Sequence, residues 1–154
     1  MKFFKSEKKQ GYTIIIGCGR LGANLANTLS DIGEDIIIVD INKSSFRKLS
    51  PSFGGMTILG DASEVSVLID AEIEKAAAVI SVTNNDNTNI MIAQIAKEFF
   101  NVPHVIARLY DPEKECVYKE FGIETICPAV LSLKEIDKLL SLGQTETEED
   151  DKAE

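Results

Sequence analysis

Short apolar runs recur along the chain and alternate with longer segments in which apolar residues have helical spacing. The runs are almost continuously apolar and several are rich in valine and isoleucine, which is typical of strands covered on both faces of a parallel sheet. We expect strands at Tyr12–Ile16, Ile36–Asp40, Met56–Leu59, Ala78–Val82, His104–Leu109 and Glu124–Cys127.

The segments between these runs carry the capping residues of helices. Ser, Thr, Asp and Asn side chains accept hydrogen bonds from the free N–H groups at a helix start, and glycine commonly ends a helix. The clearest case has Asp111 as cap, Pro112 at the first helical position and Gly122 at the end. The other helices are expected over Leu21–Ile32 up to Gly33, from Asn42 or Ser44 to about Leu49, onward from a Ser63 cap, from Asp86 or Asn87 to about Phe100, and from about Val130 to Leu142.

Strands and helices therefore alternate along the whole chain and end in a helix. Right-handed crossovers turn this order into a doubly wound α/β fold. We predict a single Rossmann-type domain, with a parallel six-stranded sheet of order 3-2-1-4-5-6 and helices on both faces. The domain is expected to span residues 11–142, after a basic extension at 1–10 and before an acidic, disordered tail at 143–154.

Charge and cysteine content exclude several other classes of protein. The last eleven residues contribute −5 of the net charge of −9, and no basic face for nucleic acid is evident. No apolar stretch is long enough for a membrane span or a signal peptide, so we expect a cytoplasmic protein. Cys18, Cys116 and Cys127 are far apart and His104 is the sole histidine, which argues against a zinc site or a disulfide framework.

The first expected strand runs directly into Gly17-x-Gly19-x-x-Gly22 and then into a helix. Between a strand and a helix, this spacing is typical of a dinucleotide-binding loop. Gly17 allows the tight turn, Gly19 lets the backbone approach a pyrophosphate, and Gly22 lets the helix pack on the strand. The helix N-terminus then presents free N–H groups to the phosphates. Arg20 can reach the phosphates as a bidentate donor, or it can remain a solvated surface residue.

Polar residues also follow later strands at the same edge of the expected sheet. Asp40 ends the second strand, where an acid accepts hydrogen bonds from ribose hydroxyls and repels a 2′-phosphate, so NADP is disfavoured. Asp61 of "GDAS" can accept a hydrogen bond from an adenine amino group. Thr83, Asn84 and Asp86 follow the fourth strand and can either contact a ribose or cap the next helix.

Several segments together resemble a known family. They are "IIIGCGRLG", "IIIVDIN", "ILGDAS", "VTNNDNTN" and "ARLYDPE" with "KEFGIETICP". Many dehydrogenases share the first two, whereas the last three, in this order, are much more specific. Over roughly residues 11–140, the chain resembles the N-terminal nucleotide-binding domain of the regulators of potassium conductance, the cytosolic subunits of Trk/Ktr-type potassium uptake systems.

This resemblance implies binding of an adenine nucleotide, either ATP, ADP or AMP or else NAD(H). Phosphates would lie on the loop Gly17–Gly22, the ribose on Asp40 and adenine beside Asp61. Arg20 would read the terminal phosphates, and Arg108 would lie near the nucleotide, although a structural ion pair is an alternative for it. The predicted nucleotide-binding residues are Gly17, Cys18, Gly19, Arg20, Leu21, Gly22, Asp40, Ile41, Asp61, Ala62, Thr83, Asn84 and Arg108.

The resemblance also implies partners. Such domains form dimers and rings beneath a membrane potassium-channel subunit, which would place this chain at the inner face of the membrane. The candidate contacts are the helix Glu113–Phe121 and the segment Ala129–Leu142, whose apolar face is equally consistent with a core position. Glu120 would help to hold a divalent cation at the dimer interface, although by itself it has the character of a helix-surface residue. Family members usually add a second, ligand-binding domain, which a separate regulator chain could supply here.

The sequence favours a regulatory binding protein over an enzyme. The predicted domain takes up nearly the whole chain and leaves no module for a substrate, and neither His104 nor Cys116 has a neighbour that would activate it. We expect nucleotide binding to shift the geometry of a dimer or ring that gates a membrane pore. The alternatives are an NAD(H)-binding oxidoreductase subunit completed by another chain, and a sensor that controls a different target.

Overall fold

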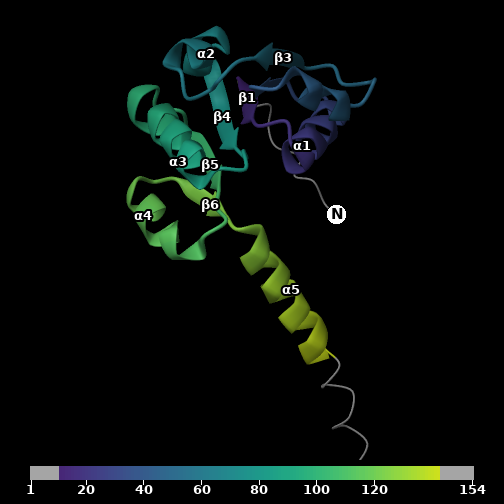
Figure 1. Cartoon of the computed structure of the whole chain (residues 1–154), viewed down its shortest axis with the longest axis vertical. Helices are drawn as coiled ribbons and strands as arrows, with labels where there is room; N and C mark the ends of the chain where they lie inside the picture. The colour runs from purple at the N-terminus through teal and green to yellow at the C-terminus, as the bar shows by residue number, and fades with distance from the viewer. Residues whose placement is uncertain (1–10, 143–154) are drawn as a thin grey trace, which may run out of the picture.

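Six parallel strands form one sheet in the order β3-β2-β1-β4-β5-β6, which confirms the predicted order (Figure 1). The structure is a computed structural model that describes residues 11–142. The predicted extension at 1–10 and the predicted tail at 143–154 lie outside the described residues. The strands are β1 (Tyr12–Ile16), β2 (Ile36–Asp40), β3 (Met56–Leu59), β4 (Ala76–Ser81), β5 (His104–Arg108) and β6 (Glu124–Ile126).

The central strands are buried on both faces, as their apolar composition predicts. Ile14 and Ile15 of β1 and Ile38 and Val39 of β2 are completely buried. Strand β1 pairs with β2 on one side and with β4 on the other, so the sheet grows in opposite directions from β1. Such a reversal opens a crevice at the carboxyl ends of the strands, which is where doubly wound sheets bind ligands.

Helices cover the two faces of the sheet (Figure 1). On one face, α1 and η1 pack against Ile15, Ile36 and Ile38. On the other face, α2, α3 and α4 contribute Leu68, Ile92 and Tyr118 to the larger apolar core. The helical elements are α1 (Arg20–Asp31), η1 (Lys43–Lys48), α2 (Val65–Asp70), η2 (Ile73–Lys75), α3 (Asp86–Gln94), the π-helical turn η3 (Ile95–Phe99), η4 (Pro112–Lys114), α4 (Glu115–Glu120) and α5 (Pro128–Leu142).

Predicted helix ends are confirmed at Gly33, Asn42 and Asp111, and Gly122 follows the end of α4 with φ of 67°. Gly33 follows α1 with φ of 83°, in the left-handed region that favours glycine. Asn42 caps η1 by accepting a hydrogen bond from Ser44 N, and Asp111 caps η4 by accepting one from Glu113 N. Each of these ends is set by a side chain or a backbone conformation only a few residues away, so the local sequence is sufficient to predict it.

One predicted cap is wrong. Ser63 does not cap α2, because its N–H and its hydroxyl both donate to Asp61 Oδ1 in the turn before the helix. Helix α3 begins at Asp86, as predicted, and Asn85 caps it by accepting a hydrogen bond from Thr88 N. The Asp86 carboxylate accepts hydrogen bonds from the loop after β5, as described below.

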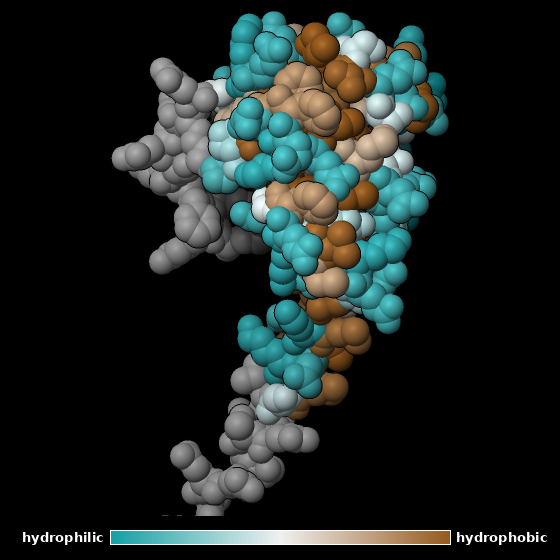
Figure 2. Space-filling view, turned by 90° about the vertical axis from the view of Figure 1, so that its left-hand side faces the viewer, coloured by the Kyte–Doolittle hydropathy of each residue, from teal (hydrophilic) through white to brown (hydrophobic). Residues whose placement is uncertain are grey.

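Helix α5 leaves the body of the molecule and projects away from it (Figure 1). The side chains of Leu133, Ile136 and Leu140 are exposed by 66%, 52% and 69%, so this apolar face is not part of the core that residues 11–142 form. These three lie on one side of the helix, whereas Leu131 lies about half a turn away. Figure 2 shows hydrophobic residues gathered along one side of the projecting helix. None of the described helices combines the length and hydropathy that crossing a bilayer requires.

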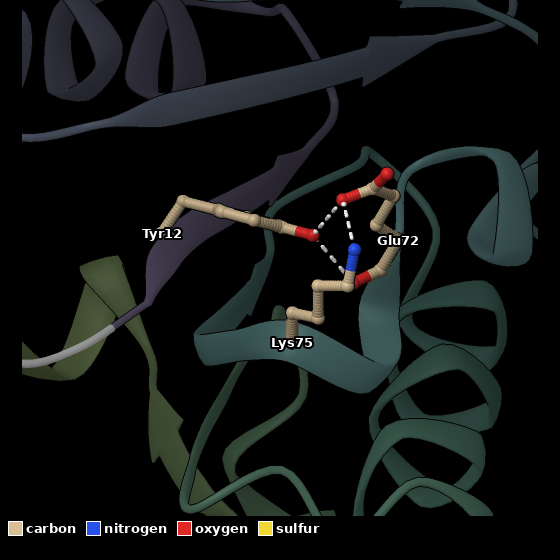
Figure 3. A network of polar contacts seen from close by, with 3 residues as sticks. All are labelled: Tyr12, Glu72 and Lys75. Atoms are coloured by element: carbon tan, nitrogen blue, oxygen red, sulfur yellow. Dashed lines mark hydrogen bonds and ion pairs between the residues drawn. The ribbon is translucent and has the colours of Figure 1, made fainter.

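A polar contact ties β1 to the connection between α2 and β4 (Figure 3). The Tyr12 hydroxyl donates to the backbone carbonyl of Glu72 at 2.7 Å, and it lies 3.1 Å from the Glu72 carboxylate. Lys75 Nζ approaches the same carboxylate at 3.2 Å. Burial is the largest reason why the pKa of Tyr12 rises to about 12, and the Glu72 carboxylate adds to this effect. Tyr12 is the first residue of its strand, so this contact lies at the amino ends of the strands, opposite the crevice.

Candidate nucleotide-binding cleft

A cavity of about 880 Å³ opens at the carboxyl ends of the strands. Ligand pockets measure about 300–1,000 Å³, so this cavity has room for a nucleotide. The loops after β1, β2, β3, β4 and β5 all contribute to its lining. Among the predicted nucleotide-binding residues, it is lined by Gly17, Gly19, Arg20, Leu21, Asp40, Ile41, Asp61, Ala62, Thr83, Asn84 and Arg108.

The glycines of the first loop have distinct structural roles. Gly17 has φ of 103°, which favours glycine, and a Cβ there would lie 3.0 Å from Thr83 N. A Cβ at Gly22 would overlap the carbonyl oxygen of Gly17, so Gly22 serves the packing of α1 and does not line the cavity. Gly19 has open space where a side chain would lie, and α1 begins after it without a side-chain cap. The first N–H groups of α1 are therefore available to a phosphate.

Asp40 organises the loop as well as lining the cavity. Its Oδ2 accepts a hydrogen bond from Cys18 N, and its Oδ1 accepts one from Asn42 N, each at 2.7 Å. Each carboxylate oxygen can accept a further bond, so a ribose hydroxyl could still be bound. Cys18 does not line the cavity: its buried thiol donates to Ser45 O, and burial, followed by the charge of Asp40, raises the pKa of that thiol.

Asp61 lies at the same side of the cavity as Asp40, in the turn after β3. Its Oδ1 accepts hydrogen bonds from Ser63 Oγ at 2.6 Å and from Ser63 N at 2.9 Å. These bonds lower the pKa of the Asp61 carboxyl. Asp61 is therefore ionised at neutral pH and is a hydrogen-bond acceptor, as recognition of an amino group requires.

Asn89 on α3 joins the ends of β4 and β5 beneath the other half of the cavity. Its side chain is completely buried. Asn89 Oδ1 accepts hydrogen bonds from Ser81 Oγ, Thr83 N and Thr83 Oγ1, and its Nδ2 donates to Thr83 O and Arg108 O. The hydroxyl of Thr83 is therefore held by the protein itself, and its position in the cavity depends on Asn89.

Asp86 holds a distant loop of the protein, which is neither of the two roles considered for it, a ribose contact or a helix cap. Its Oδ1 accepts a hydrogen bond from Tyr110 N at 2.8 Å, and its Oδ2 accepts one from Asp111 N at 3.1 Å. The carboxylate thus fixes the loop after β5 to the start of α3. It does not line the cavity.

Two arginines line the cavity in different surroundings. Arg20 is exposed at the first position of α1. Arg108 is partly buried at the end of β5, and its guanidinium lies over the ring of Tyr110, 4.4 Å from the ring centroid. Arg108 Nη2 also donates to the Tyr110 hydroxyl at 2.8 Å. The predicted structural ion pair is not seen, because no carboxylate among residues 11–142 lies at ion-pair distance from Arg108.

Residues considered for metal binding or catalysis lie away from the cavity. Glu120 is exposed at the end of α4, and residues 11–142 contain no cluster of three potential metal ligands. A cation at Glu120 would therefore need further ligands from outside residues 11–142. His104 is exposed at the start of β5, at the opposite edge of the sheet, and Cys116 is exposed on α4.

Sequence reasoning missed several residues of the cleft. Asn42, Ser45, Tyr110 and Pro128 also line the cavity. The rule that identified Thr83, a polar side chain following a strand, applies equally to Tyr110. The signal for Asn89 is a polar residue on the apolar side of a helix, since Ile92 and Ala93 are buried on the same helix. The position of Pro128 in the cleft depends on how α5 leaves the body, which the sequence does not reveal.

Comparison with known proteins places these features in a family. The TrkA-N domain family model matches residues 13–128. A Trk system potassium uptake protein TrkA of Streptomyces coelicolor is 41% identical over 115 residues, which are 75% of this chain and 52% of that protein. One of Vibrio alginolyticus is 35% identical over 134 residues, 82% of this chain and 29% of that protein. The chain thus spans about half, or less, of the length of these relatives.

Solved structures share the fold at lower sequence identity. The TrkA-N domain of inner membrane protein ybaL from Escherichia coli has a TM-score of 0.76 at 18% identity, over 87% of this chain and 99% of that one. The GsuK RCK domain has a TM-score of 0.75 at 23% identity, over 91% of this chain and 30% of that one. Further neighbours include GsuK bound to ADP, the GsuK channel bound to NAD, and the Kef CTD of Shewanella denitrificans in its AMP-bound form, with TM-scores of 0.64, 0.65 and 0.68.

The matched family segment contains every residue that was predicted to contact the nucleotide, because the match begins at residue 13 and ends at 128. It also covers all six strands, apart from the first residue of β1. The fold, the cleft and the sequence similarity therefore agree. The chain belongs to the TrkA-N domain family.

Proposed function

We propose that this chain is a regulatory subunit of a potassium uptake or channel system, and that it binds an adenine nucleotide in the cleft. The observation that carries the proposal is the composition of the cleft. The acidic side chains Asp40 and Asp61 lie at one end, the glycine loop follows, and Arg108 lies at the other end. This arrangement suits a ligand with a nucleoside at one end and negative charge further along.

The ligands of structural neighbours support the same class of ligand. GsuK and the Kef CTD were solved with ADP, NAD or AMP. These neighbours share 16%, 17% and 21% of their residues with this chain, so they support an adenosine-containing ligand without distinguishing among the three. Asp40 adds one restriction, because its carboxylate would repel the 2′-phosphate of NADP.

Signalling requires that the nucleotide changes something that a partner can detect. A ligand shifts a two-state equilibrium only through its different affinities for the two states. Arg20 is exposed at the glycine loop and can respond to the charge of a terminal phosphate. We infer that nucleotides with different terminal charge favour different geometries of a dimer or ring, and that a membrane pore responds to the geometry.

The exposed side of α5 supports self-association. Leu133, Ile136 and Leu140 expose more than half of their surface on a helix that contacts little of the body. Burying a leucine or isoleucine side chain contributes about 1.5–3 kcal/mol, so a second copy would be stabilised by covering this face. Exposed Val117 on α4 and Phe121 directly after it would extend the contact. Glu120 lies beside them and could hold a divalent cation if the second copy supplied further ligands.

The names of the relatives suggest the pore partner. They are Trk system potassium uptake proteins, and this chain covers 52% and 29% of the two described above. We infer a membrane potassium-channel subunit as the partner and a position at the inner face of the membrane. A second regulator chain could contribute the ligand-binding domain that would complete the assembly.

Calorimetry with the full chain tests this proposal. Affinities for ATP, ADP, AMP, NAD and NADH would be measured with and without Mg²⁺, for the wild type and for Arg20→Ala. A preference for one phosphorylation or redox state that is lost in Arg20→Ala supports a regulatory switch. Tight binding of NAD(H) alone that is indifferent to Arg20 would instead favour the oxidoreductase subunit. No binding of any of the five would contradict both.

A further inference from the structure

Tyr110 contributes a surface to the cleft that neither the sequence motifs nor the proposed function uses. It follows β5 and lines the cavity together with Arg108. Its ring lies under the Arg108 guanidinium at 4.4 Å, and its hydroxyl accepts a hydrogen bond from Arg108 Nη2. Stacking on a ring holds a guanidinium in one plane, and the N–H groups that do not bond to Tyr110 stay free for an anionic partner.

Tyr110 is itself anchored on both sides of its backbone. Its N–H donates to Asp86 at the start of α3, and its carbonyl accepts a hydrogen bond from the Cys127 thiol at 3.8 Å. The backbone of Arg108 is held by Asn89. The two side chains therefore stand on a rigid base, which lowers the entropy that a ligand must overcome to order them.

The hydrogen-bonding groups of Arg108 are not all satisfied within the described part of the protein. Its Nε is buried and lacks a hydrogen-bond partner among residues 11–142. A buried polar group without a partner destabilises its own state, and this cost is larger for a charged group. With no carboxylate at ion-pair distance in the described chain, the guanidinium carries a charge that an anion would compensate.

We propose that Tyr110 is a specificity-determining residue that positions Arg108 to bind the phosphates beyond the first phosphate of an adenine nucleotide. The inference rests on the proposed binding of a nucleotide in this cleft. With adenosine beside Asp40 and Asp61 and the first phosphate on the glycine loop, the remaining phosphates extend toward Thr83 and Arg108. Tyr110 thereby favours ATP and ADP over AMP.

A nicotinamide riboside is the competing occupant of this half of the cleft. The oxidised nicotinamide ring is positively charged and would be repelled by Arg108, whereas a phosphate would be attracted. The surroundings of Arg108 therefore favour the phosphate. The same contrast provides a test, because the two occupants respond differently to a change at Tyr110.

The test compares nucleotide affinities of the full chain and its Tyr110→Leu variant by calorimetry. We expect the affinity for ATP to fall about tenfold, which corresponds to about 1.4 kcal/mol, while the affinity for AMP changes less than twofold. Tyr110→Phe keeps the ring and loses the hydroxyl, so its loss should be smaller. In an Arg108→Gln background, Tyr110→Leu should have no further effect, as expected for a residue that acts through Arg108.

Phe99→Leu is the matched control, because Phe99 is an exposed aromatic residue that does not line the cavity. An equal loss for AMP and ATP in Tyr110→Leu would overturn the inference and indicate a structural role. A loss confined to NAD or NADH would overturn it in favour of a nicotinamide riboside. An unchanged ratio of ATP to AMP affinity would overturn this inference alone, whereas a wild type that binds no nucleotide would overturn the proposed function as well.

Discussion

At the scale of single residues, two glycines of one loop show how the same residue type can serve ligand binding or folding. Gly22 is required for packing, because a side chain there would overlap the backbone of Gly17. Gly19 has no atom within 4 Å of the place where a Cβ would lie, and that space belongs to the cleft. The two glycines of the motif therefore meet two different requirements, helix packing at Gly22 and open space for a ligand at Gly19.

Substituting each glycine by alanine should distinguish the requirement of folding from that of ligand binding. We expect Gly22→Ala to lower the free energy of unfolding by about 3 kcal/mol, since the overlapping atom is backbone and cannot turn away. Gly19→Ala should change it by less than about 0.5–1 kcal/mol, because its φ of −74° suits alanine. The affinity of Gly19→Ala for a nucleotide should nevertheless fall by about tenfold or more. Urea denaturation and calorimetry measure the two effects, and a destabilised Gly19→Ala would contradict this assignment.

Asn89 is the second position where a single side chain determines local structure. Replacing it by leucine would leave Ser81 Oγ and Thr83 N without their acceptor inside the protein. Each buried group left unpaired costs about 1–3 kcal/mol, so we expect Asn89→Leu to destabilise the fold by about 2–4 kcal/mol. Ser81→Ala removes only one of these bonds and should cost about 1 kcal/mol. Equal losses for the two variants, measured by urea denaturation, would show that the network contributes no more than one bond.

At the scale of elements, α5 is the helix whose position departs most from a doubly wound fold. It leaves the body after Cys127 and presents Leu133, Ile136 and Leu140 without cover from residues 11–142. Its first residue, Pro128, nevertheless lines the cleft. The helix therefore connects the proposed nucleotide site to the proposed contact with a second copy, a connection that a regulatory subunit requires.

Charged residues on the apolar side of α5 should prevent self-association without unfolding the domain. We expect Leu133→Glu with Leu140→Glu to convert the oligomer into a monomer, because the two leucines lie on the same side and glutamate is a good helix former. Light scattering coupled to size exclusion would measure the mass. Lys134→Gln with Lys138→Gln alters the opposite side and serves as the control. A monomeric wild type, or an oligomer unaffected by the leucine variant, would contradict the role of α5.

At the scale of the whole molecule, contacts at the amino ends and at the carboxyl ends of the strands respond to different conditions. The contact of Tyr12, at the amino ends, responds to pH. The pKa of Tyr12 rises from 10.0 to about 12 in the folded protein, so the neutral hydroxyl is the form that stabilises the fold. This stabilisation is complete below pH 10 and is lost as the pH rises toward 12.

The variant Tyr12→Phe should isolate this response. We expect it to be less stable than the wild type at neutral pH, because the bond to the Glu72 carbonyl is lost. The difference should narrow between pH 10 and pH 12, where the wild type loses the same contribution. Thermal unfolding midpoints across this range measure the difference. A gap that stays constant up to pH 12 would show that Tyr12 does not titrate as described.

A nucleotide that binds in the cleft, at the carboxyl ends of the strands, should stabilise the whole fold. Because the cavity is lined by loops after five of the strands, a bound ligand would hold both halves of the sheet together. A ligand that binds only the folded state at a hundred times its Kd raises the free energy of unfolding by about 2.7 kcal/mol. We expect ATP to raise the melting temperature accordingly, and Gly19→Ala to require a higher ATP concentration for the same increase.

Much of this molecule could be predicted from local patterns. Apolar runs indicated the six strands because burial on both faces requires continuous apolar residues, and their alternation with helices implied the sheet order. The glycine loop and Asp40 could also be identified from the sequence. Close approach of the backbone requires glycine at fixed positions, and the acid stands directly at the end of a strand, so both signals are local. Most predicted nucleotide-binding residues line the cavity, since the carboxyl ends of parallel strands meet at one edge.

The tertiary structure decided what depends on groups that are distant in the sequence. Asn89 and Asp86 both belong to the segment after β4. Asn89 donates to the backbone of Arg108. Asp86, which the sequence suggested as a ribose contact, instead accepts hydrogen bonds from the backbone of Tyr110 and Asp111. The exposure of α5 is likewise invisible in its periodicity, because an apolar stripe is the same whether it faces a core or a partner. Sequence alone therefore determined the sheet and the loop. The pairing of Arg108 with Tyr110 and the direction of α5 follow from contacts that form only when the chain folds.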